Sequence, residues 1–415
     1  MFKKYLYYLI ILVSLIPSLV NASDTYEAKV EDNYYINLED AIANANSEDT
    51  IVLTSNEILE ETLIINKTIN LDLNGKSISA PSKVFQVQGG TLNLTGEGTI
   101  KELEPNYGAI MVIGSTNPND NTYSVINVGE KVKLEGWSGI FITHDNTKSY
   151  GVKINLDGKI NAVNDINGDT GAGIYTNGNI KDKNNAPIIN ITDKAKITST
   201  GNGLYIAGYS TINIGKSYIS GIESAIGIKS GILNIDGATI ICTGEDKTPT
   251  EGYNNGIKAS GTTIQIESNN GYTGDIELNI KSGNLTSKYS NVIYEYIGKG
   301  NTTTVKSINL SGGNYVSEKN KDIFLLSNSL QTKHKKFITG GTYTSNPNKY
   351  LKDSYTSTLD NNKYTVIKST MKEIFFTKQL NKPKNLNFII TIVIIITLGL
   401  ILYFNRTKIF NKVNK

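Results

Sequence analysis

The stretch INIGKSYIS, residues 212–220, decides the fold, and LNIDGATII, residues 233–241, nearly repeats it. Each stretch opens with an apolar–Asn–apolar triplet, passes through a small turn and ends in a second short apolar run. An apolar–polar–apolar alternation is typical of a strand with one face turned inward. The triplet recurs along the chain, centred on Asn70, Asn93, Asn127, Asn155, Asn190, Asn213, Asn234, Asn279 and Asn309.

A different apolar run precedes most of these triplets, at intervals of 22 to 35 residues. The runs are GAIMVI (108–113), SGIFIT (138–143), GAGIYT (171–176), NGLYIA (202–207), SAIGIK (224–229), NGIKAS (255–260), SNVIYE (290–295) and DIFLLS (322–327). Each unit therefore holds three short strands that cannot bury their apolar face alone, whereas stacked units form one continuous core. The repeat predicts an all-β protein, a right-handed parallel β-helix solenoid.

The asparagine of each triplet lies between two inward residues and is expected to face outward. Such a row could bind sugars. Stacked amides also bond to one another along a stack of strands. We favour this structural role for the row over ligand binding.

The two ends of the repeat differ from its middle, as the open ends of a solenoid require. Leu38, Ala41, Ile42 and Ala45 have helical spacing, and Asn37 is a plausible N-cap with Asp40 three residues later. We expect a short helix to cover the N-terminal end. The triplet is lost in residues 346–387, which we assign to a C-terminal cap and linker, with a last strand near residues 364–367.

Two segments predict export and membrane anchoring. Residues 1–22 carry Lys3 and Lys4, then an apolar stretch and a small-residue pattern ending at Ala22, as a cleaved signal peptide does. Residues 388–404 are apolar and uncharged, which predicts one transmembrane helix. The basic tail 405–415 would then be cytoplasmic. Between them we expect an extracellular part, with cap and first strands at 23–68 and repeats at 69–345, on a single-pass protein of the cell membrane.

Charge and cysteine content exclude some classes of function. The formal net charge is +3, but six positive charges lie in the two terminal segments, so the body carries −3 and no basic footprint for nucleic acid. Arg406, in the basic tail, is the only Arg of the chain. Cys242 is the only Cys and lies in an apolar run, so we expect a buried, inert thiol and no internal disulfide.

Three stretches resemble a family of surface proteins. LEDAIANANSEDTIVLTSN (38–56) and INKTINLDLNGKSIS (65–79) resemble the opening of right-handed β-helix surface proteins of low-GC Gram-positive bacteria. ITGGTYTSNPNKYLKDSYTSTLDNNKYTV (338–366) resembles their closing segment. The resemblance implies a pectate-lyase-like fold, which hosts both enzymes and binders, and implies no particular activity.

The residues do not form the catalytic patterns of such enzymes. The pectate lyases that the fold resembles typically use Ca²⁺-binding carboxylates and an Arg or Lys base, and the predicted extracellular part has no Arg. The adjacent Asp pair, Gly-His-Gly and Arg-Ile-Lys of polygalacturonases are missing from the sequence. Asp165-Ile166-Asn167-Gly168-Asp169 is more typical of a turn than of a cation site. His144 and His334 lack metal-ligand spacing and are expected at the surface. We therefore assign no catalytic, cofactor-binding or metal residue, and no cofactor.

Polar insertions favour a binding function instead. They fall between the first strand and the triplet of several units, at 114–123, 143–150, 177–186, 267–275 and 297–304. Because units stack in register, these loops should gather on one side, bringing Tyr123, Tyr150 and Tyr272 there. We predict a non-catalytic, adhesin-like or structural surface protein that binds a glycan or a protein. The alternative is a polysaccharide lyase or glycoside hydrolase acting on an envelope or host polysaccharide.

Overall fold

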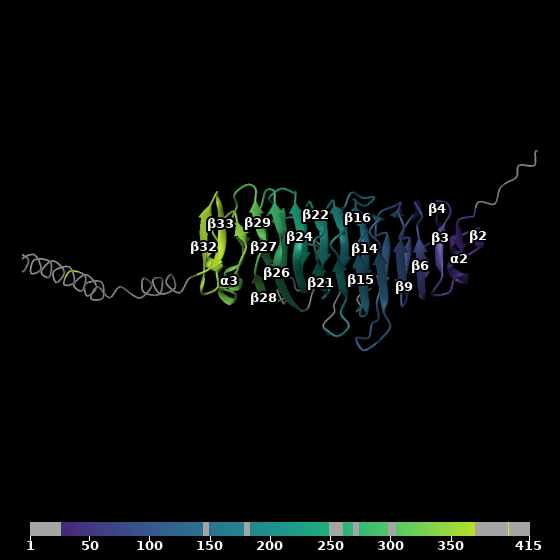
Figure 1. Ribbon diagram of the computed structural model, residues 1–415, viewed down its shortest axis with the longest axis horizontal. Coiled ribbons are helices and arrows are strands. Elements are labelled where there is room, and N and C mark those ends of the chain that lie inside the picture. The colour runs from purple at the N-terminus through teal and green to yellow at the C-terminus, as the bar shows by residue number, and fades with distance from the viewer. Residues whose placement is uncertain are drawn as a thin grey trace, which may run out of the picture.

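The computed structural model describes residues 26–143, 149–177, 183–248, 260–268, 274–297 and 304–369, together with Thr397. The chain forms an all-β, solenoid-like fold in which most strands pair in parallel with the equivalent strand of the next coil. Figure 1 shows the coils following one another along the long axis, from purple at the N-terminal end to yellow-green at the C-terminal end. This confirms the all-β repeat architecture that the triplets predict.

Each coil contributes one strand to each of three rows. The first row is a separate ten-stranded sheet, here called row B. Its strands are β5 (Leu63–Ile65), β8 (Phe85–Gln88), β11 (Ile110–Ile113), β14 (Ser138–Thr143), β17 (Ala172–Thr176), β20 (Asn202–Ile206), β23 (Ser224–Ile228), β25 (Thr262–Ser268), β27 (Ile293–Ile297) and β30 (Phe324–Leu325).

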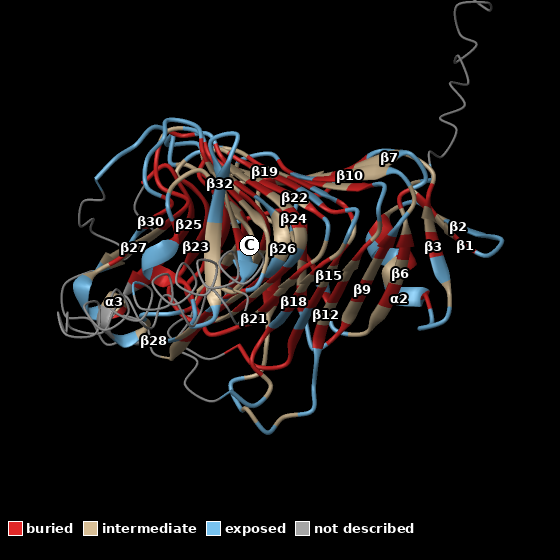
Figure 2. Cartoon of the chain, turned by 60° about the vertical axis from the view of Figure 1, so that its left-hand side comes forward, coloured by how far each residue is buried: buried red, intermediate tan, exposed pale blue. Residues whose placement is uncertain are grey.

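The other two rows share one 23-stranded sheet. The triplet row comprises β3 (Thr50–Leu53), β6 (Thr68–Asp72), β9 (Thr91–Thr95), β12 (Ser124–Val128), β15 (Val152–Leu156), β18 (Ile188–Ile191), β21 (Thr211–Ile214), β24 (Gly231–Cys242), β26 (Asp275–Ser287) and β28 (Thr304–Leu310). The third row comprises β4 (Glu57–Ile58), β7 (Lys76–Ala80), β10 (Gly98–Glu102), β13 (Val132–Gly136), β16 (Lys159–Ala162), β19 (Lys196–Ser199), β22 (Tyr218–Gly221), the second halves of β24 and β26, β29 (Asn314–Ser317) and β31 (Thr342–Tyr343). Figure 2 shows β12, β15, β18 and β21 side by side in the triplet row, with β10, β19 and β22 in the third row above them.

The triplets have the predicted orientation. Ile212 and Ile214 are buried, at 0% and 2% exposure, whereas Asn213 between them is partly exposed. The same alternation in every coil builds one continuous apolar core along the solenoid. Burying each such side chain contributes roughly 1.5–3 kcal/mol.

The nine triplet asparagines pair in register and form an unbroken chain of side-chain hydrogen bonds, here called the Asn ladder. Each Nδ2 donates to the Oδ1 of the preceding coil, over distances of 2.6 to 3.0 Å. At the N-terminal end, Asn70 donates to the backbone oxygens of Ser47 and Asp49. The structural role predicted for this row is confirmed.

Two coils differ from the expected three separate strands. In β24 and β26 the triplet strand and the third-row strand form one continuous strand. Gly237 and Gly283 lie within these strands at φ +101° and +131°, a conformation that favours glycine. Both glycines allow the strand to bend where other coils have a turn.

Both ends are capped. Helix α2 (Leu38–Asn44) has the predicted N-cap, because the Asn37 side chain accepts from Asp40 N at 2.7 Å. Next to it, β1 (Ala28–Val30) pairs antiparallel with β3 and with β2 (Asn33–Tyr35). The C-terminal end has the short helices α3 (Asn328–Lys333) and η1 (Asn348–Tyr350), and the antiparallel pair β32 (Tyr355–Asp360) and β33 (Lys363–Lys368). The last strand was predicted within β33, whereas α3 and β32 were not.

One predicted strand, NGIKAS at 255–260, lies outside the described residues apart from Ser260. The row-B strand that pairs with β23 is β25, at residues 262–268. It has the inward alternation in TTIQIE, where Ile264 and Ile266 are both 0% exposed and pair with Ile226 and Ile228.

The predicted export and anchor segments fall outside the described residues. These are the signal peptide 1–22, the transmembrane helix 388–404 (apart from Thr397) and the tail 405–415. Across the part of the chain that the structure describes, every helix is too short or too polar to span a bilayer.

Candidate ligand-binding site

The outer face of row B carries a column of aromatic rings, one from each of three successive strands. Phe141 stacks on Tyr175 with ring centroids 4.8 Å apart, and Tyr175 stacks on Tyr205 at 4.3 Å. Trp137 lies 5.3 Å from Tyr175 at a tilt of 49°. Because the three stacked rings cover one another's faces along the solenoid axis, this column stabilises neighbouring coils rather than offering flat ring faces to a ligand.

Beyond Tyr205 the same face carries a buried polar network, here called the relay. Lys229 Nζ lies 3.2 Å from Glu267 Oε1, with side chains 0% and 1% exposed, and 5.4 Å from the Tyr205 ring centroid. Gln265 Nε2 donates to Glu267 Oε2 at 3.2 Å, and Ser260 Oγ donates to Gln265 Oε1 at 2.5 Å. The relay therefore connects a fully buried ion pair to a hydroxyl that lines a surface pocket.

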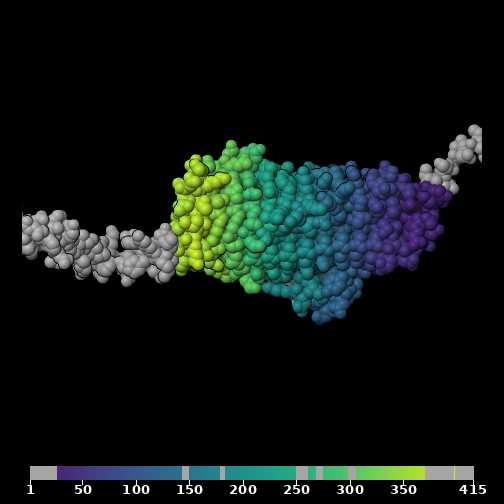
Figure 3. All heavy atoms as spheres, in the orientation of Figure 1, coloured from purple at the N-terminus to yellow at the C-terminus, as the bar shows by residue number. Residues whose placement is uncertain are grey.

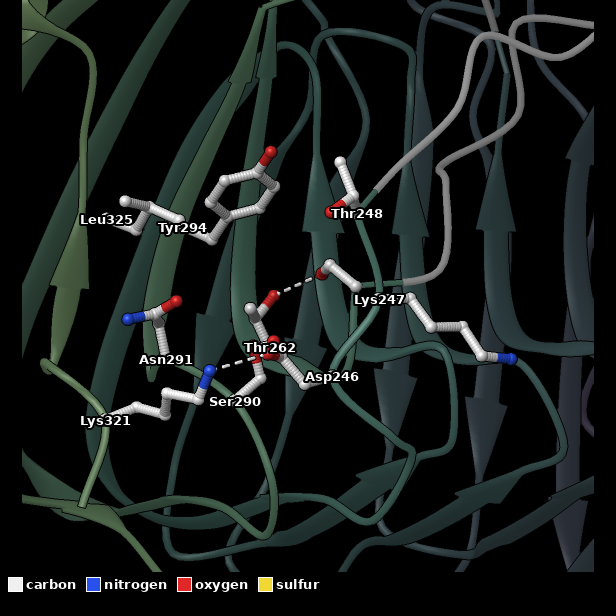
Figure 4. Close-up of a pocket in the computed structure, with 10 residues that line it drawn as sticks. Asp246, Lys247, Thr248, Thr262, Ser290, Asn291, Tyr294, Lys321 and Leu325 are labelled. Carbon is white, nitrogen blue, oxygen red and sulfur yellow. Dashed lines mark hydrogen bonds and ion pairs between the residues drawn. The ribbon is translucent and has the colours of Figure 1, made fainter. Parts of the chain in front are cut away.

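This pocket, here called the β25–β27 pocket, has a volume of about 200 Å³ and is shown in Figure 4. Ser260 and Thr262 form part of it, with their hydroxyl oxygens 2.7 Å apart. The Tyr294 ring and the Leu325 side chain supply its apolar part (Figure 4). Its remaining lining is polar: Asp246, Lys247, Thr248, Ser290, Asn291 and Lys321.

Two charged groups of the pocket, Asp246 and Lys321, form an ion pair. Lys321 Nζ lies 2.9 Å from Asp246 Oδ2, and Ser290 Oγ donates to Asp246 Oδ1 at 2.6 Å. Burial raises the pKa of Asp246, but the bonds from Lys321 and Ser290 outweigh it and hold that pKa below its ordinary value. Burial raises the pKa of Tyr294. At neutral pH the pocket thus presents an ionised carboxylate, an ammonium group and an intact phenol.

This arrangement suits recognition of a polar ligand more than bond cleavage. A glycosidase of the common type needs two carboxyl groups about 5–9.5 Å apart, one of them able to give up a proton. In the pocket and relay, Asp246 is ionised and paired with Lys321, and Glu267 is paired with buried Lys229. Nowhere in the described ranges do three or more His, Cys, Asp or Glu side chains form a group that could hold a metal ion.

The predicted gathering of loops is confirmed for two of the five, 114–123 and 177–186, in their described residues. Tyr123 Oη donates to Asn185 Oδ1 at 3.2 Å, and Asn185 Nδ2 donates to Pro118 O at 2.7 Å, so loops from two coils contact each other. Segment 114–123 projects from the lower edge of the solenoid in Figures 1 and 3. Tyr123 is 47% exposed, but Tyr150 is 1% exposed and not available to a ligand, contrary to prediction. Tyr272 lies outside the described residues.

The other predicted residues behave as structural groups. Asp165 Oδ1 accepts from Asn167 N and Asp169 N, both at 2.8 Å, which confirms the turn. His334 Nε2 lies 2.8 Å from Val305 O at the end of α3, whereas His144 lies outside the described residues. Cys242 is 0% exposed, and burial raises its thiol pKa to about 11, as expected of an inert thiol.

Sequence reasoning missed both the aromatic column and the relay. A signal for the column is present, because the tripeptides Gly139-Ile140-Phe141, Gly173-Ile174-Tyr175 and Gly203-Leu204-Tyr205 place an aromatic residue at the same position of successive units. The relay has a weaker signal, in the charged residues that end SAIGIK and TTIQIE.

Comparison with known proteins adds no relative: no family model, no curated protein and no solved structure matches the chain.

Proposed function

We propose that this protein is a membrane-anchored surface protein whose extracellular right-handed parallel β-helix binds a glycan without altering it. The β25–β27 pocket carries this proposal, because it combines hydroxyl, amide and ammonium groups with one aromatic ring in about 200 Å³. A sugar offers hydroxyls to such groups and an apolar ring face to a tyrosine. The volume suits one sugar unit or a chain end rather than a long polymer.

The protonation of the pocket supports binding over turnover. Asp246 stays ionised beside Lys321 and cannot serve as a general acid at neutral pH. It can still accept a hydrogen bond from a ligand hydroxyl, and charge-assisted bonds of this kind are among the stronger ones.

Anchoring at the cell membrane is the second part of the proposal. Its support is the sequence pattern at 1–22 and 388–404, with the basic tail after it. The resemblance to β-helix surface proteins of low-GC Gram-positive bacteria agrees with this location. We infer no nucleic-acid partner and no cofactor.

The alternative function is a polysaccharide lyase or glycoside hydrolase, and the relay is the observation that favours it. A desolvated lysine beside a carboxylate is a common arrangement at active sites. However, both side chains of the Lys229–Glu267 pair are almost completely buried, whereas a catalytic group must touch its substrate.

The test is a glycan array probed with the full-length chain in mild detergent. We expect Tyr294→Ala and Lys321→Met each to weaken binding of the captured glycan threefold to tenfold, because each removes one polar or stacking contact. Lys306→Met is the matched control, because Lys306 also forms a surface ion pair, with Glu277 at 2.7 Å, away from the pocket. Equal losses in all three variants would show that the pocket is not the binding site.

A turnover assay separates the two functions. The same protein is incubated with pectin, alginate, hyaluronan and peptidoglycan, with and without Ca²⁺. Unsaturated ends would reveal lyase activity and new reducing ends hydrolysis. Either product, if lost in Lys229→Met or Glu267→Gln variants that remain folded, would replace the binding function with the enzymatic one.

A further inference from the structure

A second candidate surface, which combines amide and apolar side chains, lies on the triplet row over the Asn ladder. Four consecutive ladder members, Asn190, Asn213, Asn234 and Asn279, line a groove of about 600 Å³, here called the ladder groove. This volume falls within the range of ligand-binding clefts. The strands that carry it belong to the triplet row, of which β12, β15, β18 and β21 are visible side by side in Figure 2.

The ladder asparagines keep hydrogen-bonding capacity for a ligand. A side-chain amide has two N–H donors and a carbonyl oxygen with two lone pairs. In the ladder, Asn213 donates one N–H to Asn190 Oδ1 at 2.9 Å, and its Oδ1 accepts one bond from Asn234 Nδ2 at 2.9 Å. The described residues occupy neither the second N–H nor the second lone pair of these three amides. The groove thus repeats one donor and one acceptor at every coil, with the inter-strand spacing of roughly 4.8 Å.

The ladder also fixes the direction of these amides. Each one is held between two neighbours, so its exposed N–H and C=O edges are already oriented before a ligand arrives. Binding to such a surface orders few side chains, and this lowers the entropic cost of association.

The charges of the groove do not favour a polyanion. Asp193 Oδ1 accepts from the backbone N–H of Lys216 at 2.9 Å. Asp236 bonds to Lys281 Nζ and Ser282 Oγ, both at 2.6 Å, and the bond from Lys281 lowers the pKa of Asp236. Asp193, Asp236 and Lys281 are its charged lining, and Lys216 is close enough for its charge to lower the pKa of Asp236, so the groove has no excess of positive charge. A neutral ligand avoids repulsion there, and its hydroxyls can donate to the carboxylates.

The shortest coil keeps the groove open. Gly215 lines the groove directly after the Asn213 triplet, and a Cβ at this position would collide with the carboxylate of Asp193. Among the four coils that line the groove, the other three carry Thr192, Asp236 and Lys281 at this position, so the turn GKS leaves the most space.

We propose that the ladder groove binds one extended chain of a neutral, hydroxyl-rich polysaccharide, which lies parallel to the long axis of the solenoid. An extended β-linked pyranose chain advances by roughly one inter-strand spacing per sugar, so successive sugars meet successive asparagines. This inference rests on the proposed glycan-binding function, of which it names the ligand class and a second binding surface, but it does not depend on the β25–β27 pocket.

The experiment compares two ladder substitutions in the full-length chain in mild detergent. Asn213→Ala removes a ladder member inside the groove. Asn127→Ala is the matched control, because Asn127 has the same two ladder bonds, at 2.6 and 2.7 Å, but does not line the groove. Cellohexaose, chitohexaose and mannohexaose serve as neutral probes and oligogalacturonate as the acidic one, with affinities measured by calorimetry and melting temperatures by circular dichroism.

We expect both variants to melt at similarly lowered temperatures, and only Asn213→Ala to bind a neutral hexasaccharide three- to tenfold more weakly. Equal affinities of the two variants would overturn the groove proposal, as would tighter binding of oligogalacturonate than of every neutral probe. If Tyr294→Ala abolishes binding while Asn213→Ala does not alter it, the groove proposal fails and the proposed function stands. If no glycan binds to the unmodified protein, both fail.

Discussion

Replacing Lys229 with Met removes the cation from an ion pair whose two side chains are 0% and 1% exposed. The substitution keeps an unbranched apolar stem, but it takes away the ammonium group that lies 3.2 Å from Glu267 Oε1. The bond from Gln265 to the other carboxylate oxygen, at 3.2 Å, does not neutralise the charge. Breaking a buried pair on one side typically costs about 3–5 kcal/mol, and we expect a loss of this size in the free energy of unfolding.

Removing both charges should cost much less. In K229M/E267Q the amide at position 267 can still accept from Gln265, and no charge remains buried. Neutral replacements of buried ion pairs are often close to neutral in stability, so we expect the double variant within about 1 kcal/mol of the unmodified protein. The double variant should therefore be roughly 2–4 kcal/mol more stable than K229M alone.

Urea denaturation at neutral pH and low salt measures these differences, followed by circular dichroism and by the fluorescence of Trp137. Lys194→Met is the control, since Lys194 and Glu130 form an exposed pair (62% and 56%) that should contribute little to stability. The reasoning is refuted if K229M costs no more than K194M, or if K229M/E267Q is as unstable as K229M alone.

Three further predictions address the cap, the core and the anchor. Burial and a hydrogen bond with Glu27 raise the pKa of Glu57 from 4.5 to about 8. The contribution of this group to stability is therefore complete below pH 4.5 and is lost as the pH rises towards 8. We expect E57Q to leave the melting temperature nearly unchanged near pH 5 and to raise it near pH 9. Ile212→Asp should lower the free energy of unfolding by several kcal/mol and Asn213→Ser by only about 1 kcal/mol, and equal effects in thermal melts would contradict the observed orientation of the triplet. Truncation after Asn385 should release the protein into the medium, and the anchor prediction is wrong if the truncated chain still sediments with membranes.

The repeat could be predicted from the sequence because stacked coils need the same inward and outward pattern in every unit. A triplet whose outer residues are inward and whose asparagine is outward has the same orientation in every coil, so one local pattern sets the register of the whole solenoid. Asn213 and its eight counterparts were therefore predicted in position and role. The helix at Asn37 was predictable for a similar reason, since capping depends on neighbours three residues apart.

The relay could not be predicted in this way. In SAIGIK and TTIQIE, the alternation assigns Lys229 and Glu267 to the outer face, where a charged residue is normally solvated. Their burial depends on what packs over that face, and a local period contains no information about it.

The two proposed surfaces differ in periodicity: the ladder groove repeats from coil to coil, and the relay with its pocket does not. A periodic surface such as the ladder groove presents the same amide at every coil, so it matches a ligand that is itself periodic, and no coil can become a unique reactive centre. The relay lies where periodicity fails: Gly227, Gln265 and Tyr294 follow the aromatic column in register, but each has a different chemistry. A site that distinguishes one sugar from another requires such a break in the repeat. Under the two proposals, the molecule would hold a polymer along one row and recognise a particular sugar unit on another.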